Sequence, residues 1–149
     1  MQIFIGADYR GFKLKENLLQ KLAQKNYNVT DLGSFSSDSV DDFNDPAIAV
    51  ARAVRENPGA FGILICDSAH GVTIQANRFK GIRAAHCGTP ESALLAREHD
   101  DANILCLSAH FVDANTAESI MTTFLNTAFQ SLERRNRRIN RLDEGEDYD

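Results

Sequence analysis

The sequence predicts an α/β fold, a single-domain three-layer α/β/α sandwich around a five-stranded parallel sheet of the Rossmann-like kind. Two observations predict it. Strand-like and helix-like segments alternate five times along the 149 residues. The strand-like segments are also too apolar to leave one face in water, which is typical of parallel strands covered by helices on both sides. The length suits one domain, and we find neither a linker nor an internal repeat.

The elements of the first half follow from local sequence. Residues 2–7 (QIFIGA) form an apolar strand, and leucines recur on one face of a helix over 12–26. Residues 27–32 form a short second strand. A helix follows over 46–55, with Asp45 as its predicted N-cap and a proline at its first position.

The second half continues the alternation after a Pro-Gly breaker. Residues 61–66 (FGILIC) are the most apolar strand candidate. The other strands are predicted over 81–86 and 103–107, and the helices over 72–79, 90–99 and from about 113 toward 142. Right-handed crossovers place every turn from a strand into its helix at one edge of the sheet, where ligands bind in such folds.

Composition excludes several classes of protein. The net charge of −5 and a pI near 5.3 argue against a chain-wide nucleic-acid surface. The apolar stretches are too short to span a bilayer, and we find no secretory signal. Three widely spaced cysteines predict free thiols in a reducing cytoplasm, and fit neither a disulfide framework nor a zinc site. The domain is predicted to cover residues 1–142. Residues 143–149 contain five acids in seven positions and are predicted to form a solvated, disordered tail.

The turn Cys66-Asp-Ser-Ala-His-Gly71, between the third strand and its helix, is the first candidate for chemistry. A helix N-terminus offers free N–H groups and a partial positive charge, which suit a phosphate or a developing enolate. The same field lowers the pKa of a thiol, so Cys66 is a candidate base or nucleophile. A buried structural cysteine is the alternative, and composition alone favours it. The turn lacks the glycine patterns of nucleotide sites.

Three further places carry candidate groups. Asp8 follows the first strand and so lies at the same edge, where it is either a functional carboxylate or the N-cap of the next helix. His99 is a candidate general acid or base, or a partner of a helix dipole. Arg134, Arg138 and Arg141 share a helix face that suits a phosphate, and a solvated basic face and a nucleic-acid patch are the alternatives.

Several short motifs stand in a fixed order. They are Gly6-Ala-Asp8 with Gly11-Phe-Lys-Leu-Lys15, Asp31-Leu-Gly33, Asp42-Phe-Asn-Asp45, Gly62-Ile-Leu-Ile-Cys66, Ile74-Gln-Ala-Asn77 with Gly81-Ile-Arg-Ala84, Arg97-Glu-His99 with Ala102-Asn103, and Arg134…Arg138. In order and spacing they resemble the ribose-5-phosphate isomerase B / galactose-6-phosphate isomerase family, from Ile3 to about Leu142. The resemblance implies a five-stranded α/β/α sandwich and a homodimer or dimer of dimers, with sites built from two chains.

The resemblance also implies the chemistry. An aldose phosphate and its ketose would interconvert through an enediolate, with no metal or cofactor, and the partner would be a phosphorylated sugar rather than nucleic acid or membrane. Cys66 would take the carbon-bound proton, with its pKa lowered by the following helix. Ser68 would serve a substrate oxygen. Backbone N–H groups of the turn, including His70, Gly71 and Val72, would stabilise the enediolate.

The remaining roles are also carried over from the family. His99 matches the residue that helps open the sugar ring, with Asp8 on the other side. Arg134 and Arg138 match the pair that binds the phosphate, and phosphate binding helps orient the reacting end of the sugar.

This sequence departs from the family at the sugar-contacting positions. Tyr9 replaces the usual histidine after the first-strand aspartate, and Asp100 replaces an asparagine. The usual Gly-Thr-Gly-x-Gly turn begins here with Asp67, and the family's arginine after the last strand is His110. Arg135 replaces a histidine between the phosphate arginines.

The sequence therefore predicts a cytoplasmic sugar-phosphate isomerase most like ribose-5-phosphate isomerase B. The departures keep two alternatives open, an isomerase of another sugar phosphate (galactose or allose 6-phosphate) and a homologue that binds sugar phosphate without catalysis. Asp67 adds negative charge beside the proposed base and would raise the pKa of Cys66. We expect Asp67 to be turned away, neutralised by His70 or bound to a sugar hydroxyl.

Overall fold

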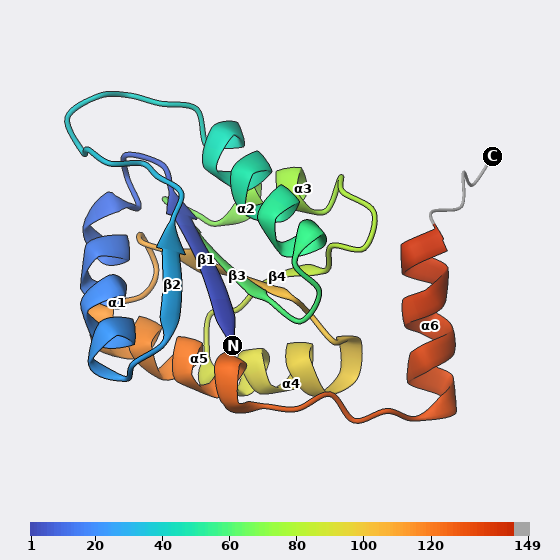
Figure 1. The fold of residues 1–149 in the computed structure, drawn as a ribbon. Coiled ribbons are helices and arrows are strands. Elements are labelled where there is room, and N and C mark those ends of the chain that lie inside the picture. The colour runs from blue at the N-terminus through green and yellow to red at the C-terminus, as the bar shows by residue number, and fades with distance from the viewer. Residues whose placement is uncertain (145–149) are drawn as a thin grey trace.

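Five parallel strands form the centre of the protein (Figure 1). The computed structural model describes residues 1–144. The strands stand in the order β2-β1-β3-β5-β4, and every neighbouring pair is parallel. This confirms the predicted sheet. The strands are β1 (Gln2–Ala7), β2 (Asn28–Asp31), β3 (Phe61–Cys66), β4 (Ala84–His86) and β5 (Ile104–Ser108).

Helices cover both faces of the sheet, because successive side chains of a buried strand point to opposite sides. Ile63 and Ile65 pack with α1, α4 and α5, whereas Leu64 and Cys66 pack with α2 and α3. This arrangement confirms the three layers and directs the Cys66 side chain toward α3. The helices are α1 (Phe12–Gln24), α2 (Asn44–Glu56), α3 (His70–Ala76), α4 (Pro90–Asp100), α5 (Ala114–Asn126) and α6 (Glu133–Glu144).

The C-terminal region differs from the single long helix predicted from about 113 toward 142. Helix α5 ends at Asn126 and α6 begins only at Glu133. The apolar face of α5 is buried against the sheet, whereas α6 is strongly polar and stands to one side of the sheet (Figure 1). Helix α6 extends to Glu144, two residues into the predicted acidic tail, and residues 145–149 of that tail lie outside the described residues.

Two helix starts also differ from the prediction. The N-cap of α2 is Phe43, so Asp45 lies inside the first turn and the predicted capping role is wrong. Asn44 begins the helix, and its side chain donates to Gln75 at 2.8 Å. Helix α3 begins at His70, two residues before the predicted start. None of the helices within residues 1–144 is long and apolar enough to cross a membrane.

The topology divides the polar residues between two edges of the sheet. We call the edge where the strands end the carboxyl edge and the edge where they begin the amino edge. Asp8 and Cys66 lie at the carboxyl edge, at the ends of β1 and β3. The segment 99–103 lies at the amino edge, because it leads into β5 and the Asn103 carbonyl accepts the N–H of Gly62 in β3 at 2.9 Å.

Candidate active site

The thiol of Cys66 lies at the end of β3, beneath the start of α3. Cys66 is 5 % exposed and belongs to the apolar cluster of α2 and α3. The N–H of Ala69 donates to its Sγ at 3.2 Å, and the N–H groups of Ser68 and Val72 also interact with the sulfur. The turn therefore surrounds the thiol with backbone donors.

The ionisation of Cys66 differs from the expected one. Burial raises the pKa of the thiol, and the negative charge of Asp8 adds to the rise. The N–H groups of Ser68, Ala69 and Val72 lower the pKa but do not cancel this effect. The predicted lowering is therefore wrong, because withdrawal of the sulfur from water outweighs the field of a seven-residue helix.

Two small residues shape the turn around the thiol. Ala69 adopts a left-handed conformation, with φ 69° and ψ −8°, and is fully buried. That conformation costs a residue with a Cβ about 1–2 kcal/mol relative to the right-handed one. At Gly71 a Cβ would lie 2.8 Å from the ring of Phe43. A side chain at this position would therefore require the Phe43 ring to move.

Asp8 closes the turn between β1 and α1. Its Oδ1 accepts the N–H groups of Arg10 at 3.1 Å and Gly11 at 2.9 Å, and the residue is 8 % exposed. The helix N-cap is Gly11, without a side-chain hydrogen bond, so Asp8 is not the N-cap. Burial raises the pKa of the Asp8 carboxyl, and the charges of Asp41 and Asp67 add to the rise.

The loop between β2 and α2 contributes two residues that the sequence analysis did not single out. Asp41 accepts the N–H of Tyr9 through Oδ1 at 2.8 Å, and Phe43 lies against Gly71. Phe43 belongs to the Asp-Phe-Asn-Asp motif that contributes to the family resemblance, and this motif could have identified it as a residue of the site. The Tyr9 hydroxyl accepts from Nε of Arg10 at 3.1 Å.

Asp67 turns toward His110. Its Oδ1 lies 3.8 Å from His110 Nδ1, and its side chain is 48 % exposed. Its carbonyl accepts the His110 N–H at 3.0 Å and the Ser108 hydroxyl at 2.6 Å. Of the three arrangements expected for Asp67, neutralisation by His70 is not the one found, since Asp67 faces His110 and the His70 ring packs against that of His86, with the centroids 5.8 Å apart.

The carboxyl edge is acidic. Asp8, Asp41 and Asp67 are close enough for their charges to act on one another, and Arg10 beside them donates to a tyrosine hydroxyl. Within residues 1–144 no group of three His, Cys, Asp or Glu side chains is placed to hold a metal ion. The three carboxylates carry more negative charge than Arg10 supplies in positive charge, which disfavours an anionic group at this edge.

The other predicted groups lie elsewhere on the chain. His99 and Asp100 form the end of α4, at the amino edge. Arg134 and Arg138 are exposed on α6, and α6 contacts α4 through Arg135, which donates to the Glu98 carbonyl. One chain thus brings together Asp8 and the turn after β3, but it separates them from the predicted ring-opening and phosphate-binding groups.

The amino-acid sequence matches the Ribose/Galactose Isomerase family over residues 3–142. The chain belongs to this family. The probable ribose-5-phosphate isomerase B of Mycoplasma pneumoniae is 41% identical over 128 residues, which are 86% of this chain and 84% of the relative. The ribose 5-phosphate isomerase of Thermotoga maritima has the same fold, with a TM-score of 0.93 and 41% identity over 97% of this chain and 98% of that one.

A second solved family member is ribose-5-phosphate isomerase B of Mycoplasma genitalium with bound ribulose-5-phosphate. It matches with a TM-score of 0.92 and 40% identity, over 96% of this chain and 94% of that one. These comparisons confirm the family and the α/β/α fold that the sequence predicts.

Two features distinguish the carboxyl edge of this chain. Ala69 adopts a left-handed backbone conformation in the turn after β3. Asp67 of the same turn lies 3.8 Å from His110, so the turn after β3 meets the segment after β5.

Proposed function

We propose that this chain interconverts ribose 5-phosphate and ribulose 5-phosphate through an enediolate. The observation that carries the proposal is the placement of Cys66, a buried thiol at a strand end beneath three backbone N–H groups. Relatives across nearly the whole chain are named for this reaction, and one of the same fold holds ribulose-5-phosphate.

The residues of the carboxyl edge suit the proton transfer. In the aldose-to-ketose direction, the Cys66 thiolate takes the proton from the carbon beside the carbonyl, and the resulting thiol protonates the former carbonyl carbon. Negative charge develops on the former carbonyl oxygen, where the N–H groups of the turn and the Ser68 hydroxyl stabilise it. This oxygen takes up the proton that the neighbouring hydroxyl releases as it becomes the ketone. Asp8 and His99 exchange the hydroxyl protons that move when the sugar ring opens.

We also propose that the working unit is a homodimer in which each site draws on two chains. The carboxyl edge of one copy supplies Cys66 and Asp8, and the partner supplies His99, Asp100 and its phosphate-binding arginines. Charge supports this assignment, because an acidic edge repels a sugar phosphate unless the arginines of α6 face it. The separation of the two groups in one chain supports it as well.

We propose a cytoplasmic location. Within residues 1–144 the three cysteines, Cys66, Cys87 and Cys106, are all free and buried. Free thiols of this kind are typical of a reducing compartment.

A second candidate is the isomerisation of a different sugar phosphate, such as galactose or allose 6-phosphate. The Asp67–His110 pair favours it, because a half-exposed carboxylate beside the turn offers a hydrogen-bond acceptor to an additional hydroxyl. The two candidates share the proton transfer and differ only in the sugar.

The proposed reaction is tested by initial rates on a panel of pentose and hexose phosphates. Cys66→Ala should lower kcat by orders of magnitude with little change in sugar-phosphate binding, because the thiolate acts in the transition state. Cys87→Ala is the matched control, since it removes a second buried thiol away from the turn. Near-normal turnover by Cys66→Ala would refute the role of the thiol. Binding without turnover by the wild type would identify a non-catalytic homologue.

The shared site is tested by mixing two inactive variants, Cys66→Ala and His99→Ala. After subunit exchange, a mixed dimer holds one site with both substitutions and one with neither. An equal mixture should therefore recover about a quarter of wild-type activity, because half of the dimers are mixed and half of their sites are intact. No recovery, with exchange verified by mass labelling, would place both residues in one chain's site.

A further inference from the structure

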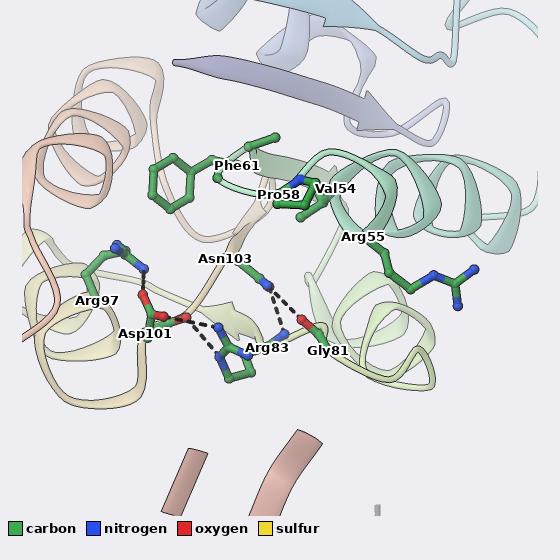
Figure 2. A pocket seen from close by; sticks show the side chains of 11 residues that line it. Val54, Arg55, Pro58, Phe61, Gly81, Arg83, Arg97, Asp101 and Asn103 are labelled. Atoms are coloured by element: carbon green, nitrogen blue, oxygen red, sulfur yellow. Dashed lines mark hydrogen bonds and ion pairs between the residues drawn. The ribbon is translucent and has the colours of Figure 1, made fainter. Parts of the chain in front are cut away.

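The amino edge contains a partly buried polar network that the proposed chemistry does not use. A cavity of about 380 Å³ opens there between the α2–β3 turn, the start of β4 and the end of α4 (Figure 2). Its lining includes Arg55, Arg83, Arg97, Asp101 and Asn103. Three arginines around one cavity suggest an anion site at first sight, so their partners decide what the cavity is.

Each of these arginines is occupied by the protein itself. Arg97 donates to Asp101 at 2.7 Å and stacks on Phe61. Arg83 donates from Nε to the Asp101 carbonyl at 3.0 Å and from Nη2 to its carboxylate at 3.2 Å. Arg55 points away from this pair and lies over the ring of Phe79 (Figure 2). The cavity is thus bordered by a structural network rather than by free cations.

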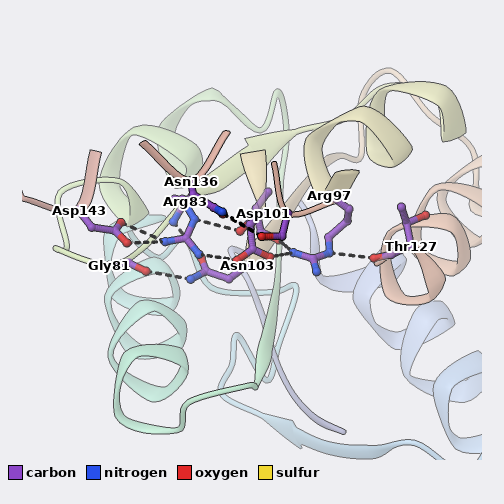
Figure 3. Close-up of polar contacts among 10 residues, drawn as sticks. Gly81, Arg83, Arg97, Asp101, Asn103, Thr127, Asn136 and Asp143 are labelled. Carbon is purple, nitrogen blue, oxygen red and sulfur yellow. Dashed lines mark hydrogen bonds and ion pairs between the residues drawn. The ribbon is translucent and has the colours of Figure 1, made fainter. Parts of the chain in front are cut away.

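The network fixes the backbone directly after His99. Asp101 ends α4 in a left-handed conformation, with φ 47° and ψ 43°, which residues other than glycine seldom adopt. Its carboxylate is shared between Arg97 and Arg83, and its carbonyl is bound by Arg83 as well. Asn103 joins the same network by accepting the N–H of Arg83 at 2.8 Å (Figure 3). The end of α4 therefore has little freedom to move.

Helix α6 is attached to this network at its far end and to α4 at its start. In the last turn, Asp143 accepts two hydrogen bonds from Nη1 of Arg83, at 2.9 and 3.0 Å (Figure 3). In the first turn, Arg135 is 8 % exposed and donates to the Glu98 carbonyl at 3.1 Å and to the Gln130 side chain at 2.9 Å. Both attachments lead to the end of α4.

The two attachments set the direction in which the phosphate arginines point. Arg134 immediately precedes the buried Arg135, and so projects about 100° around the helix from it. Arg138 follows one turn later on the same exposed face. A rotation or tilt of α6 would move these two side chains relative to His99. Arg83, which lies on neither helix, is bonded both to Asp101 at the end of α4 and to Asp143 in α6.

We propose that Arg83 is a positioning residue for the isomerase, which fixes the ends of α4 and α6 so that His99 and the phosphate-binding arginines face the partner's Cys66 as one rigid unit. This inference rests on the proposed function for the roles of those groups. Arg83 itself acts through Asp101 and Asp143, and touches neither substrate nor reacting atoms.

The test compares Asp143→Asn, Arg83→Gln and their double variant with the wild type. Asp143→Asn frees the end of α6 alone, so KM for ribose 5-phosphate and the Kd for inorganic phosphate should both rise about three- to tenfold, with kcat changed less. Arg83→Gln should also lower kcat, because it frees Asp101 beside His99. The double variant should be no worse than Arg83→Gln, since both changes remove the same bond.

Glu144→Gln is the matched control, because it removes the neighbouring exposed carboxylate of the same helix turn and should leave KM unchanged. Calorimetry with inorganic phosphate keeps the two proposals distinct, because it does not require turnover. A wild type that binds phosphate without isomerising would refute the proposed function, and the Kd values would still decide the role of Arg83. The positioning role would be overturned if Asp143→Asn left KM and Kd unchanged. It would also be overturned if the two changes had additive effects in the double variant, or if Glu144→Gln weakened binding as much as Asp143→Asn. If Arg83→Gln fails to fold, Asp143→Asn alone decides.

Discussion

The ionisation of Cys66, the proposed base, sets how turnover depends on pH. An ordinary thiol has a pKa of about 8.5, and burial together with the charge of Asp8 raises the pKa of Cys66 above its ordinary value. At pH 7 the reactive thiolate is therefore a smaller fraction of the sites than it would be for an ordinary thiol. Because a raised pKa leaves less thiolate at neutral pH, kcat/KM should rise about tenfold per unit between about pH 6 and 8.

The substitution Asp8→Asn probes the same ionisation. It removes the negative charge that raises the pKa of Cys66, while the amide oxygen can still accept the N–H groups of the turn. The midpoint of the kcat/KM profile should move to lower pH but stay above that of an ordinary thiol, because burial is the larger cause and remains. The midpoint is the decisive quantity, since Asp8 also has a proposed role in ring opening that affects the height of the curve.

Initial rates on ribose 5-phosphate from about pH 5.5 to 9.5 measure both profiles. The other thiols do not interfere, because burial raises the pKa of Cys106 to about 12 and also raises that of Cys87. A wild-type plateau below about pH 8, or a midpoint that stays fixed or rises in Asp8→Asn, would refute the assignment of the rising limb to Cys66.

Three further predictions follow from contacts and charge. Arg138→Ala should cost about 1.5–3 kcal/mol of binding free energy for every phosphorylated sugar, measured by calorimetry, and unchanged affinity would mean that this side chain is only solvated. Asp67→Gly should raise ribose 5-phosphate turnover by lowering the activation free energy by about 1 kcal/mol. Asp100→Asn should raise turnover further. The estimate is modest because the Asp67 carboxylate is half exposed, and slower turnover in steady-state kinetics would contradict it. Gly11→Ala should lower the free energy of unfolding by about 1–3 kcal/mol in urea, since its Cβ would lie 2.5 Å from a carbonyl oxygen of β3. Gly88→Ala, which meets nothing within 4 Å, is the control, and equal loss in both would contradict the steric cause.

Much of the fold was predictable because buried parallel strands have a strong local signal. The strand over 61–66 matches β3 at both ends, since a Pro-Gly breaker precedes its apolar run and a polar turn follows it. The end of α5 had no such signal, because neither glycine nor proline occurs between 113 and 142. The helix stops where its apolar face stops, and that depends on packing against the sheet.

The candidate site was predictable in its residues more than in its electrostatics. Asp8 and Cys66 follow their strands, so their common edge could be inferred from chain order. His99 precedes β5, so chain order places it at the opposite edge from Asp8 and Cys66, an inference that the sequence also permitted. The pKa of Cys66 depends on how deeply the thiol is buried, and the partner of Asp67 depends on how β5 lies beside β3. Neither can be derived from local sequence.

The placement of Cys66 and His99 on opposite edges has a consequence for enzyme concentration. In the proposed dimer an isolated chain holds two incomplete halves of a site, so dissociation removes activity without unfolding the protein. Specific activity should then be constant at high concentration and fall on dilution below the dimer dissociation constant, where the rate becomes second order in protein. A bound sugar phosphate bridges the two chains, so substrate itself should protect the enzyme against dilution.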